Sequence, residues 1–278
     1  MNEVCDIRQP ESIAPVRSTD LLGSPVQVLS LGAGVQSSTM ALMAEHGEIT
    51  PKPSFCVFAD TGDEPKAVYD WLDQLEKLLS FPVIRAQRSR LSEHLFEWGH
   101  SQIPAFTAGP NGEPRLGKRQ CTKHWKIVPV QQAIRKHLSL QRKRLAKGHA
   151  IVWQGISLDE IVRMKDSREP WIEHRFPLID LRMSRHDCIR WLKSHNYPQP
   201  PKSACVFCPY QPPKHWKAMR EAGGEEWKTI VIVDRLLAAD GAYLTKDLRR
   251  IDAIEFTDAD KDQNQLSFMD ECDGMCGV

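Results

Sequence analysis

An apolar strand, a glycine turn and an amphipathic helix follow one another near the N-terminus, and this succession constrains the fold most. Residues 26–31 are predicted to form the strand, 32–34 the turn and 37–45 the helix. In such a unit, glycines at positions 32 and 34 let the backbone turn tightly at positive φ and approach a ligand closely. The N–H groups of the first helical turn then face an anion. The segment predicts an α/β fold with a phosphate-binding loop.

The same alternation continues along the chain. Residues 55–60 are continuously apolar, as in a strand covered on both faces, and Pro65 suits the first turn of a helix over 65–79. Further predicted elements are a strand over 81–86, a long helix over 127–145 and a strand over 150–156. Strands and helices in alternation, with short connections, predict a doubly wound, mostly parallel sheet.

After Asp159 the pattern changes. Predicted helices over 184–195 and 225–237 are separated by a proline-rich stretch, 197–201, and by a pair of cysteines. A chain of 278 residues can bury one large core and a small appendage. We therefore expect a flexible N-terminal segment (1–24), a nucleotide-binding domain (25–180) and a small cysteine-bearing, loop- and helix-rich C-terminal extension (181–278).

The composition of the chain indicates the cellular compartment in which the protein works. The first 20 residues are polar and charged, unlike a signal or transit peptide, and no apolar run approaches the ~20 residues of a membrane span. We expect a cytoplasmic protein without membrane contact. In a reducing compartment its eight cysteines are expected to bind metal or do chemistry rather than form disulfides.

Charge is balanced over the whole chain but not along it. No acidic residue occurs between Glu113 and Asp159. The eleven basic residues of this acid-free stretch are Arg115, Lys118, Arg119, Lys123, Lys126, Arg135, Lys136, Arg142, Lys143, Arg144 and Lys147. Such asymmetry predicts a surface that binds a polyanion such as tRNA or DNA, and a solvated basic helix face is the alternative.

The end of the second predicted strand strengthens the case for a nucleotide site. Asp60, Thr61 and Gly62 lie beside the first loop if the two strands are neighbours. Ser37 and Ser38 add hydroxyl groups to the first turn of the helix. The loop is neither a Walker loop, which needs Gly-Lys-Ser/Thr, nor a dinucleotide G-x-G-x-x-G motif, because Ser37 replaces the third glycine. A plain tight turn is the alternative.

These two segments resemble the PP-loop superfamily, which includes ATP pyrophosphatases and sulfonucleotide (PAPS or APS) reductases. The family loop reads Ser-Gly-Gly-x-Asp-Ser. Residues 32–37 match it in frame, with Gly32, Ala33 and Gln36 replacing the serine, the first glycine and the aspartate. Residues 155–163 and 121–130 resemble later reductase elements, as in PAPS-reductase-like proteins of phages and prophages.

The resemblance implies which residues contact ATP, or PAPS or APS, together with Mg²⁺. They are Ser30, Gly32, Ala33, Gly34, Gln36, Ser37, Ser38, Asp60, Thr61, Gly62 and Gly155. Lys126 and Arg163 are expected to stabilise negative charge that develops during the reaction.

Three cysteines form a candidate metal site. Cys205 and Cys208 make a C-x-x-C turn followed by Pro209, and Cys121 provides a distant third thiolate. Soft sulfur ligands in this pattern predict an iron–sulfur cluster, with zinc as the alternative. The fourth ligand stays open among Cys188, Cys272 and Cys276, although Cys188 is better suited to core packing.

The tail admits three interpretations. Cys272 and Cys276 are candidates for a nucleophile or a cluster ligand, and a frayed end without function is the third possibility. The leading hypothesis is an ATP pyrophosphatase-type enzyme that adenylates an acceptor and transfers sulfur, in nucleic-acid thiolation. A cysteine desulfurase is a candidate partner, and the sequence does not identify the sulfur donor. The first alternative is a sulfonucleotide reductase that uses Cys272 and thioredoxin. The second is a nucleotide- or nucleic-acid-binding module with structural zinc.

Overall fold

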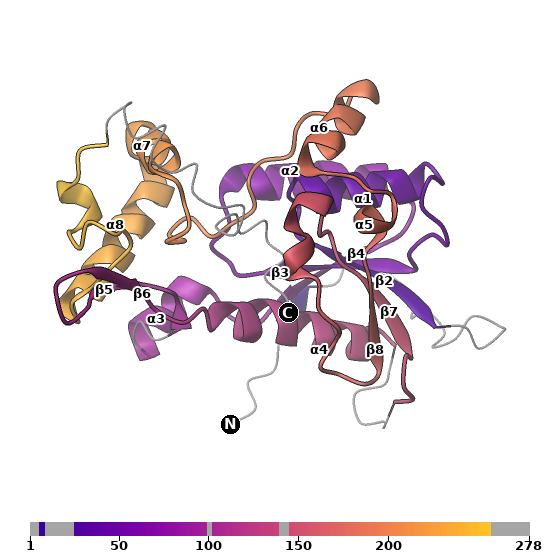
Figure 1. The fold of residues 1–278 in the computed structure, drawn as a ribbon, viewed down its shortest axis with the longest axis horizontal. Coiled ribbons are helices and arrows are strands. Elements are labelled where there is room, and N and C mark those ends of the chain that lie inside the picture. The colour runs from indigo at the N-terminus through magenta and orange to yellow at the C-terminus, as the bar shows by residue number, and fades with distance from the viewer. Residues whose placement is uncertain (1–5, 9–24, 99–101, 139–144, 257–278) are drawn as a thin grey trace.

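The computed structural model describes residues 6–8, 25–98, 102–138 and 145–256. Its centre is a six-stranded sheet in the order β1-β4-β3-β2-β7-β8 (Figure 1). Five strands are parallel, and β1 pairs antiparallel with β4 at one edge. This arrangement confirms the predicted doubly wound, mostly parallel α/β fold. The strands are β1 (Asp6–Arg8), β2 (Val26–Leu31), β3 (Phe55–Asp60), β4 (Val83–Gln87), β7 (Ala150–Trp153) and β8 (Ile172–Arg175).

Helices cover both faces of the sheet, because successive side chains of each strand point to opposite sides. Leu29 of β2 packs in one core cluster and Val28 in the other. Both faces of β2 and β3 are therefore apolar, which explains their continuous hydrophobic runs. The first face carries α1 (Val35–Glu45), α2 (Lys66–Leu78), the short α5 (Pro177–Asp180) and α6 (Arg185–Ser194). The second carries α4 (Val128–His137).

The strand order creates a switch point beside β2. From β2 the chain moves outward through β3 and β4, then returns to β7 on the other side of β2. The connections after β2 and β7 therefore leave the same edge of the sheet and lie against each other there. Ligands of open α/β sheets bind in the crevice at this place.

A second, smaller lobe lies beside the sheet, at the left of Figure 1. A three-stranded sheet of order β6-β5-β9 packs there with three helices around a separate apolar core. Its elements are α3 (Leu91–Trp98), β5 (Phe106–Ala108), β6 (Pro114–Leu116), α7 (Pro213–Ala222), α8 (Gly224–Ala239), β9 (Ala242–Tyr243) and the 3-10 turn η4 (Ile251–Ala253). The lobe thus combines part of the predicted C-terminal extension, including α7, α8, β9 and η4, with segments from the middle of the chain.

The boundaries proposed for the three parts stay a prediction. Within the segment expected to be flexible, Asp6–Arg8 forms the edge strand β1. The remaining residues before Pro25 lie outside the described part.

The predicted helix over 127–145 begins earlier and its α-helical part ends sooner. A π-helix, η2 (Thr122–Ile127), leads into α4, which ends at His137 with Leu138 as its C-cap. Pro129 explains the change of geometry, because it has no N–H to continue the α-helical hydrogen bonds of the preceding turn. Residues 139–144 lie outside the described part.

The helix predicted over 184–195 has a clear sequence signal. Ser184 accepts a hydrogen bond from the N–H of Asp187, whose carboxylate in turn accepts one from the N–H of Ser184. This capping box fixes the start of α6. In the part of the chain that is described, no helix is long and apolar enough to cross a membrane.

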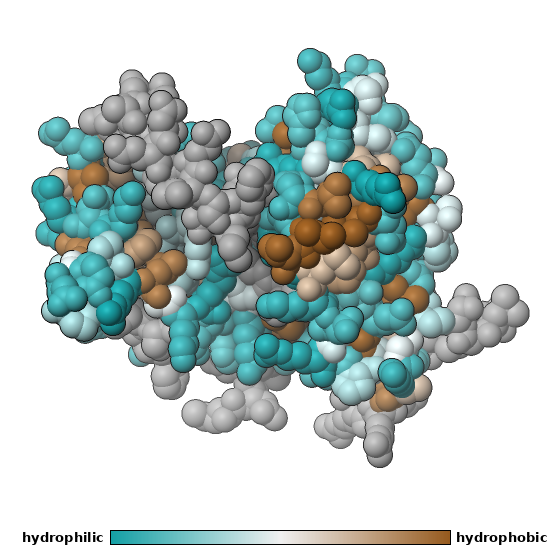
Figure 2. Space-filling view, in the orientation of Figure 1, coloured by the Kyte–Doolittle hydropathy of each residue, from teal (hydrophilic) through white to brown (hydrophobic). Residues whose placement is uncertain are grey.

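Apolar side chains also gather on one exposed face, over the 3-10 helix η3 (Leu158–Arg163) that follows β7 (Figure 2). The exposed apolar residues of η3 are Leu158, Ile161 and Val162. Two further exposed apolar residues are Met164, the C-cap of η3, and Leu181, the C-cap of α5, which contacts η3. This apolar patch therefore begins a few residues after the end of β7, close to the switch point.

Candidate nucleotide and sulfur site

The loop between β2 and α1 has the expected position but a different backbone conformation. Gly34 is the N-cap of α1 with φ −89° and ψ −175°, values that any residue adopts. Ala33 instead has φ 57°, in the left-handed region. The expectation that glycine 34 supplies a positive φ is therefore wrong. Ala33 carries that conformation, at a cost of roughly 1 kcal/mol relative to glycine.

The two serine hydroxyls of α1 hold the loop in place. Ser37 Oγ accepts a hydrogen bond from Gly32 N–H at 3.1 Å, and Ser38 Oγ accepts one from the indole N–H of Trp71 at 2.9 Å. Both serines are buried. These hydroxyls, predicted to bind phosphate, are engaged within the protein. The N–H groups of the first helical turn are the donors that a helix leaves for an anion.

Gly155 brings the β7 connection against this loop. A Cβ atom at position 155 would lie 3.1 Å from both Cα and N of Ser37, so only glycine fits without a shift. Beside it, Gln36 Nε2 lies 3.4 Å from Ser157 Oγ, while the buried Oε1 of Gln36 has no partner among the described residues. The predicted loop residues and Gly155 therefore meet at the switch point, and Ser30 lies one residue before the end of β2.

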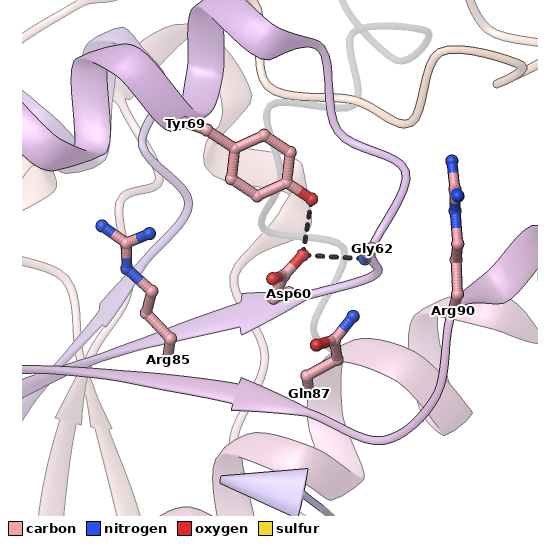
Figure 3. A pocket seen from close by; sticks show the side chains of 6 residues that line it. All are labelled: Asp60, Gly62, Tyr69, Arg85, Gln87 and Arg90. Carbon is pink, nitrogen blue, oxygen red and sulfur yellow. Dashed lines mark hydrogen bonds between the residues drawn. The ribbon is translucent and has the colours of Figure 1, made fainter. Parts of the chain in front are cut away.

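A cavity of about 420 Å³ opens at the neighbouring strand ends (Figure 3). Asp60 Oδ1 accepts hydrogen bonds from Tyr69 OH and Gly62 N, each at 2.7 Å. Burial and the adjacent Asp60 carboxylate raise the pKa of the Tyr69 phenol, which stays a hydrogen-bond donor. The lining residues are Asp60, Gly62, Tyr69, Arg85, Gln87 and Arg90.

The arginines of this cavity already have carboxylate neighbours. Arg85 pairs with Glu76 and Asp73, and Arg90 Nε donates to Asp63 at 2.9 Å. Asp63 is buried and also accepts from the N–H and hydroxyl of Ser92, at the start of α3. Asp63 therefore joins the loop after β3 to α3.

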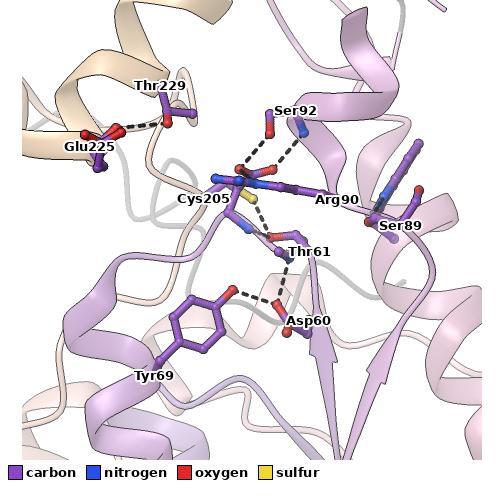
Figure 4. A network of polar contacts seen from close by, with 12 residues as sticks. Asp60, Thr61, Tyr69, Ser89, Arg90, Ser92, Cys205, Glu225 and Thr229 are labelled. Carbon is purple, nitrogen blue, oxygen red and sulfur yellow. Dashed lines mark hydrogen bonds and ion pairs between the residues drawn. The ribbon is translucent and has the colours of Figure 1, made fainter. Parts of the chain in front are cut away.

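The Cys205 segment docks on the same loop (Figure 4). Cys205 Sγ lies 3.1 Å from Thr61 Oγ1, and Val206 N–H donates to the carbonyl of Asp63 at 2.8 Å. Burial raises the pKa of the Cys205 thiol well above its usual range, and the nearby Glu64 adds to the effect. A thiol thus lies at the end of β3, the strand next to the phosphate-loop strand β2.

The other two candidate ligands pack in the same core as Cys205. Cys121 is the N-cap of η2, and the Cys208 N–H donates to the carbonyl of Cys205 at 2.9 Å. The guanidinium of Arg119 stacks over Tyr210, 3.9 Å from the ring centre, and links the two cysteine segments. The structure therefore brings all three cysteines into one lobe.

The three cysteines of this lobe are soft ligands of a kind that both iron–sulfur clusters and zinc take. In the part of the chain that the structure describes, the one set of three potential ligands whose donor atoms all lie within 4.8 Å of one another is a different one.

Lys126 and Arg163 are both paired with carboxylates. Lys126 Nζ lies 3.6 Å from Oε1 of the buried Glu64, and Arg163 pairs with the buried Glu160. Burial raises the pKa of Glu64, while the Lys126 ammonium lowers it. Sequence reasoning did not single out Glu64. Its position two residues after the Asp-Thr-Gly segment was the available signal.

Two groups of predicted residues lie apart from this site. Cys188 is fully buried in the core of the main sheet, where burial raises the pKa of its thiol to about 12. It therefore packs in a different core from the other three cysteines. Cys272 and Cys276 lie outside the described residues.

No protein-family model matches the chain, and no curated protein matches it. The structure is similar to the crystal structure of phosphoadenylyl-sulfate (PAPS) reductase from Candida auris in its phosphate complex, with 12% sequence identity and a TM-score of 0.43. The match covers 65% of this chain and 77% of that chain. The function proposed below is therefore based on the residues of the site.

Proposed function

We propose that this chain is a PP-loop enzyme that binds an adenosine nucleotide at the β2–β7 switch point and carries out sulfur chemistry beside it. The main support for this proposal is the position of one cysteine. The Cys205 thiol lies 3.1 Å from Thr61, at the end of the strand adjacent to the phosphate-loop strand. A nucleotide held by the loop would have its reactive end near a cysteine-bearing segment.

The binding roles follow from the local geometry. The N–H groups of the first turn of α1 would hold phosphate oxygens, and the close contact of Gly155 with Ser37 would keep that turn in place. Asp60 opens into the cavity beside this loop and would bind the ribose or a magnesium ion. Lys126 would counter negative charge that develops at the phosphate or sulfur atom.

Cys121, Cys205 and Cys208 would hold the iron–sulfur cluster. Such a cluster, held by three thiolates, would supply a binding site for the sulfur atom to be transferred. The thiols must lose their protons to bind the cluster. Burial raises the pKa of the Cys205 thiol, so this thiol stays protonated in the absence of a cation. Thr61 can stabilise the resulting thiolate by donating its hydroxyl hydrogen.

The leading form of the reaction is sulfur transfer to a nucleic acid. An acceptor oxygen attacks the α-phosphorus of ATP and pyrophosphate leaves. The terminal sulfur of a persulfide, supplied by a cysteine desulfurase, then displaces AMP from the adenylated position and forms a disulfide between acceptor and carrier. A second thiol attacks the carrier sulfur of this disulfide, which releases the thiolated acceptor and leaves the two thiols oxidised to a disulfide. The acid-free stretch supports a polyanionic acceptor. Four of its exposed lysines, Lys118, Lys123, Lys136 and Lys147, are offered for that surface.

The second candidate is a sulfonucleotide reductase. Its specific support is the loop itself, which carries Gln36 in place of an acid and has Ser37 and Ser38 bonded within the protein. Such a loop offers little to a magnesium-bound triphosphate. In this reaction Cys272 attacks the sulfonyl sulfur of APS or PAPS, the nucleotide leaves, and thioredoxin reduces the enzyme-bound product to release sulfite.

A paired assay separates these candidates. Anaerobically purified protein is given ATP, a persulfide donor and tRNA or DNA in one arm, and APS or PAPS with reduced thioredoxin in the other. Pyrophosphate release that depends on the acceptor supports sulfur transfer, and sulfite release supports the reductase. Retained nucleotide binding with neither product overturns both and leaves a binding module. Gly155→Ala is the control that should reduce either activity.

A further inference from the structure

A second cluster of ligand-type side chains lies at the opposite end of α1 from the phosphate loop. His46 is the C-cap of α1, Glu48 follows two residues later, and His195 is the C-cap of α6. One donor atom from each of the three lies within 4.8 Å of the other two. We propose that His46, Glu48 and His195 bind a divalent transition-metal ion, with zinc preferred.

The hydrogen bonds of His195 leave a lone pair facing Glu48. Its Nδ1 lies 2.9 Å from the carbonyl of Trp191, which can only accept, so Nδ1 carries the hydrogen in the neutral ring. Nε2 is then an acceptor, and it lies 3.7 Å from Oε1 of Glu48. Two acceptors facing each other favour a cation between them. Ligands about 2.1 Å from a tetrahedral zinc ion are about 3.4 Å apart, so little movement is needed.

The surrounding groups orient the ligands. The indole N–H of Trp191 donates to both oxygens of Glu48, at 2.9 and 3.2 Å. His46 Nε2 lies 2.9 Å from the hydroxyl of Tyr197. The Trp191 ring stacks on His195 with ring centres 4.0 Å apart. Such outer contacts are typical of metal-binding histidines and carboxylates, because they fix ring orientation and tautomer.

Two helix ends add to the attraction for a cation. Both α1 and α6 end at this cluster, with His46 and His195 as their C-caps. The C-terminus of a helix carries a partial negative charge from its last carbonyl groups. The cluster therefore combines one carboxylate, two imidazoles and two helix C-termini. Its residues are half-buried or exposed, so an ion can reach them from solvent.

The site is structural rather than catalytic. The 11 residues of α1 separate it from the phosphate loop by about 16 Å. A bound ion would link the end of α1 to the end of α6 on one face of the sheet. The proposal is independent of the proposed function. The competing interpretation is an aromatic cluster with a histidine–carboxylate pair that needs no metal.

Cobalt titration of the chelator-treated full chain tests the proposal. We expect the histidine–glutamate cluster to take up one equivalent of Co²⁺ with visible ligand-field absorption and no thiolate band, so that any near-ultraviolet thiolate-to-cobalt band belongs to the cysteine site. Zinc should displace it. His46→Gln and His195→Gln should each weaken this binding at least tenfold. Trp191→Phe, which keeps all three ligands, should weaken it about tenfold.

His186→Gln is the matched control, because His186 is exposed on the same helix α6 and lies outside the cluster. It should bind cobalt as the wild type does. Zinc should also raise the unfolding temperature of the wild type and the control but not of the His46→Gln/His195→Gln double variant. Equal cobalt binding by the wild type and the double variant would overturn the proposal. Binding that shows only thiolate bands would overturn it as well.

Discussion

Lys126 Nζ lies 3.6 Å from Oε1 of Glu64, and the two side chains are 12% and 1% exposed. The pair joins the π-helix η2, which follows Cys121, to the loop after β3, on which Cys205 docks. Ser203 also donates to Glu64, at 3.4 Å. Glu64 is therefore the point where the three segments of the candidate sulfur site meet.

Removing one member of this pair should destabilise the protein strongly. Lys126→Met leaves the Glu64 carboxylate buried without its cation, and we expect a loss of about 3–5 kcal/mol in the free energy of unfolding. The double variant Glu64→Gln/Lys126→Met should lose less than the sum of the two single variants. Urea unfolding of all four proteins measures this coupling. Simple additivity would contradict the buried pair.

Gly155→Ala should weaken nucleotide binding. The added methyl group would lie 3.1 Å from the backbone of Ser37 and displace the first turn of α1. We expect at least a tenfold rise in the dissociation constant for ATP or PAPS, measured by calorimetry. Ala33→Gly is the control, since it relieves the left-handed backbone at φ 57° and should retain binding. If Gly155→Ala binds the nucleotide as tightly as the wild type, the switch point is not part of the nucleotide site.

The stability of the second lobe should fall on acidification. Burial, with Lys202 and Lys214 nearby, lowers the pKa of His215 to about 4 from its usual 6.5. Between these values the unfolded chain binds more protons than the folded one, so this contribution to stability is lost as the pH falls from 6.5 towards 4. His215 faces Gln211, whose amide donates to the carbonyl of Cys205.

His215→Gln should flatten this pH dependence. Because the side chain is partly exposed, we expect a difference of about 1–2 kcal/mol between pH 7 and pH 4.5 relative to the wild type. The midpoints of urea unfolding at both pH values are compared, and His186→Gln, at an exposed histidine of α6, serves as the control. Parallel pH profiles for wild type and His215→Gln would show that His215 titrates normally.

Cys205→Ser should remove the colour of anaerobically purified protein. An iron–sulfur cluster absorbs broadly in the visible, and loss of a buried thiolate ligand prevents its assembly. Cys188→Ser is the matched control, because Cys188 is fully buried in the other core and contributes no ligand there. Absorption spectra and iron content of the three proteins test this. Colourless wild-type protein with one equivalent of zinc would favour the structural-zinc alternative.

Neutralising the exposed lysines of the acid-free stretch should weaken nucleic-acid binding. Of the basic residues there, Arg119 and Arg135 stack on aromatic rings and Lys126 pairs with Glu64. Lys118, Lys123 and Lys136 are exposed, and their replacement by Gln should flatten the salt dependence of RNA or DNA binding by about 2–3 in log–log slope. Small-nucleotide affinity should not change. Wild-type protein without salt-dependent binding would count against a nucleic-acid acceptor.

The sequence alone predicted four of the six strands of the main sheet, β2, β3, β4 and β7, and the loop after the first of them. Continuous apolar runs such as 55–60 are typical of strands covered on both faces, and a capping box fixed the start of α6. These signals are local, because they depend on side chains a few residues apart and on the periodicity of a strand or helix. They are sufficient to predict the α/β fold and the approximate position of the phosphate loop.

Tertiary structure alone decided which distant groups meet. The pairing of Lys126 with Glu64, the contact of Cys205 with Thr61, and the cluster of His46 with His195 join residues far apart in sequence. No local pattern encodes such contacts, because they depend on how whole elements pack. Likewise, the left-handed conformation fell on Ala33 rather than on a glycine, since the surrounding loop and α1 fix the backbone there whatever the intrinsic preference of the residue.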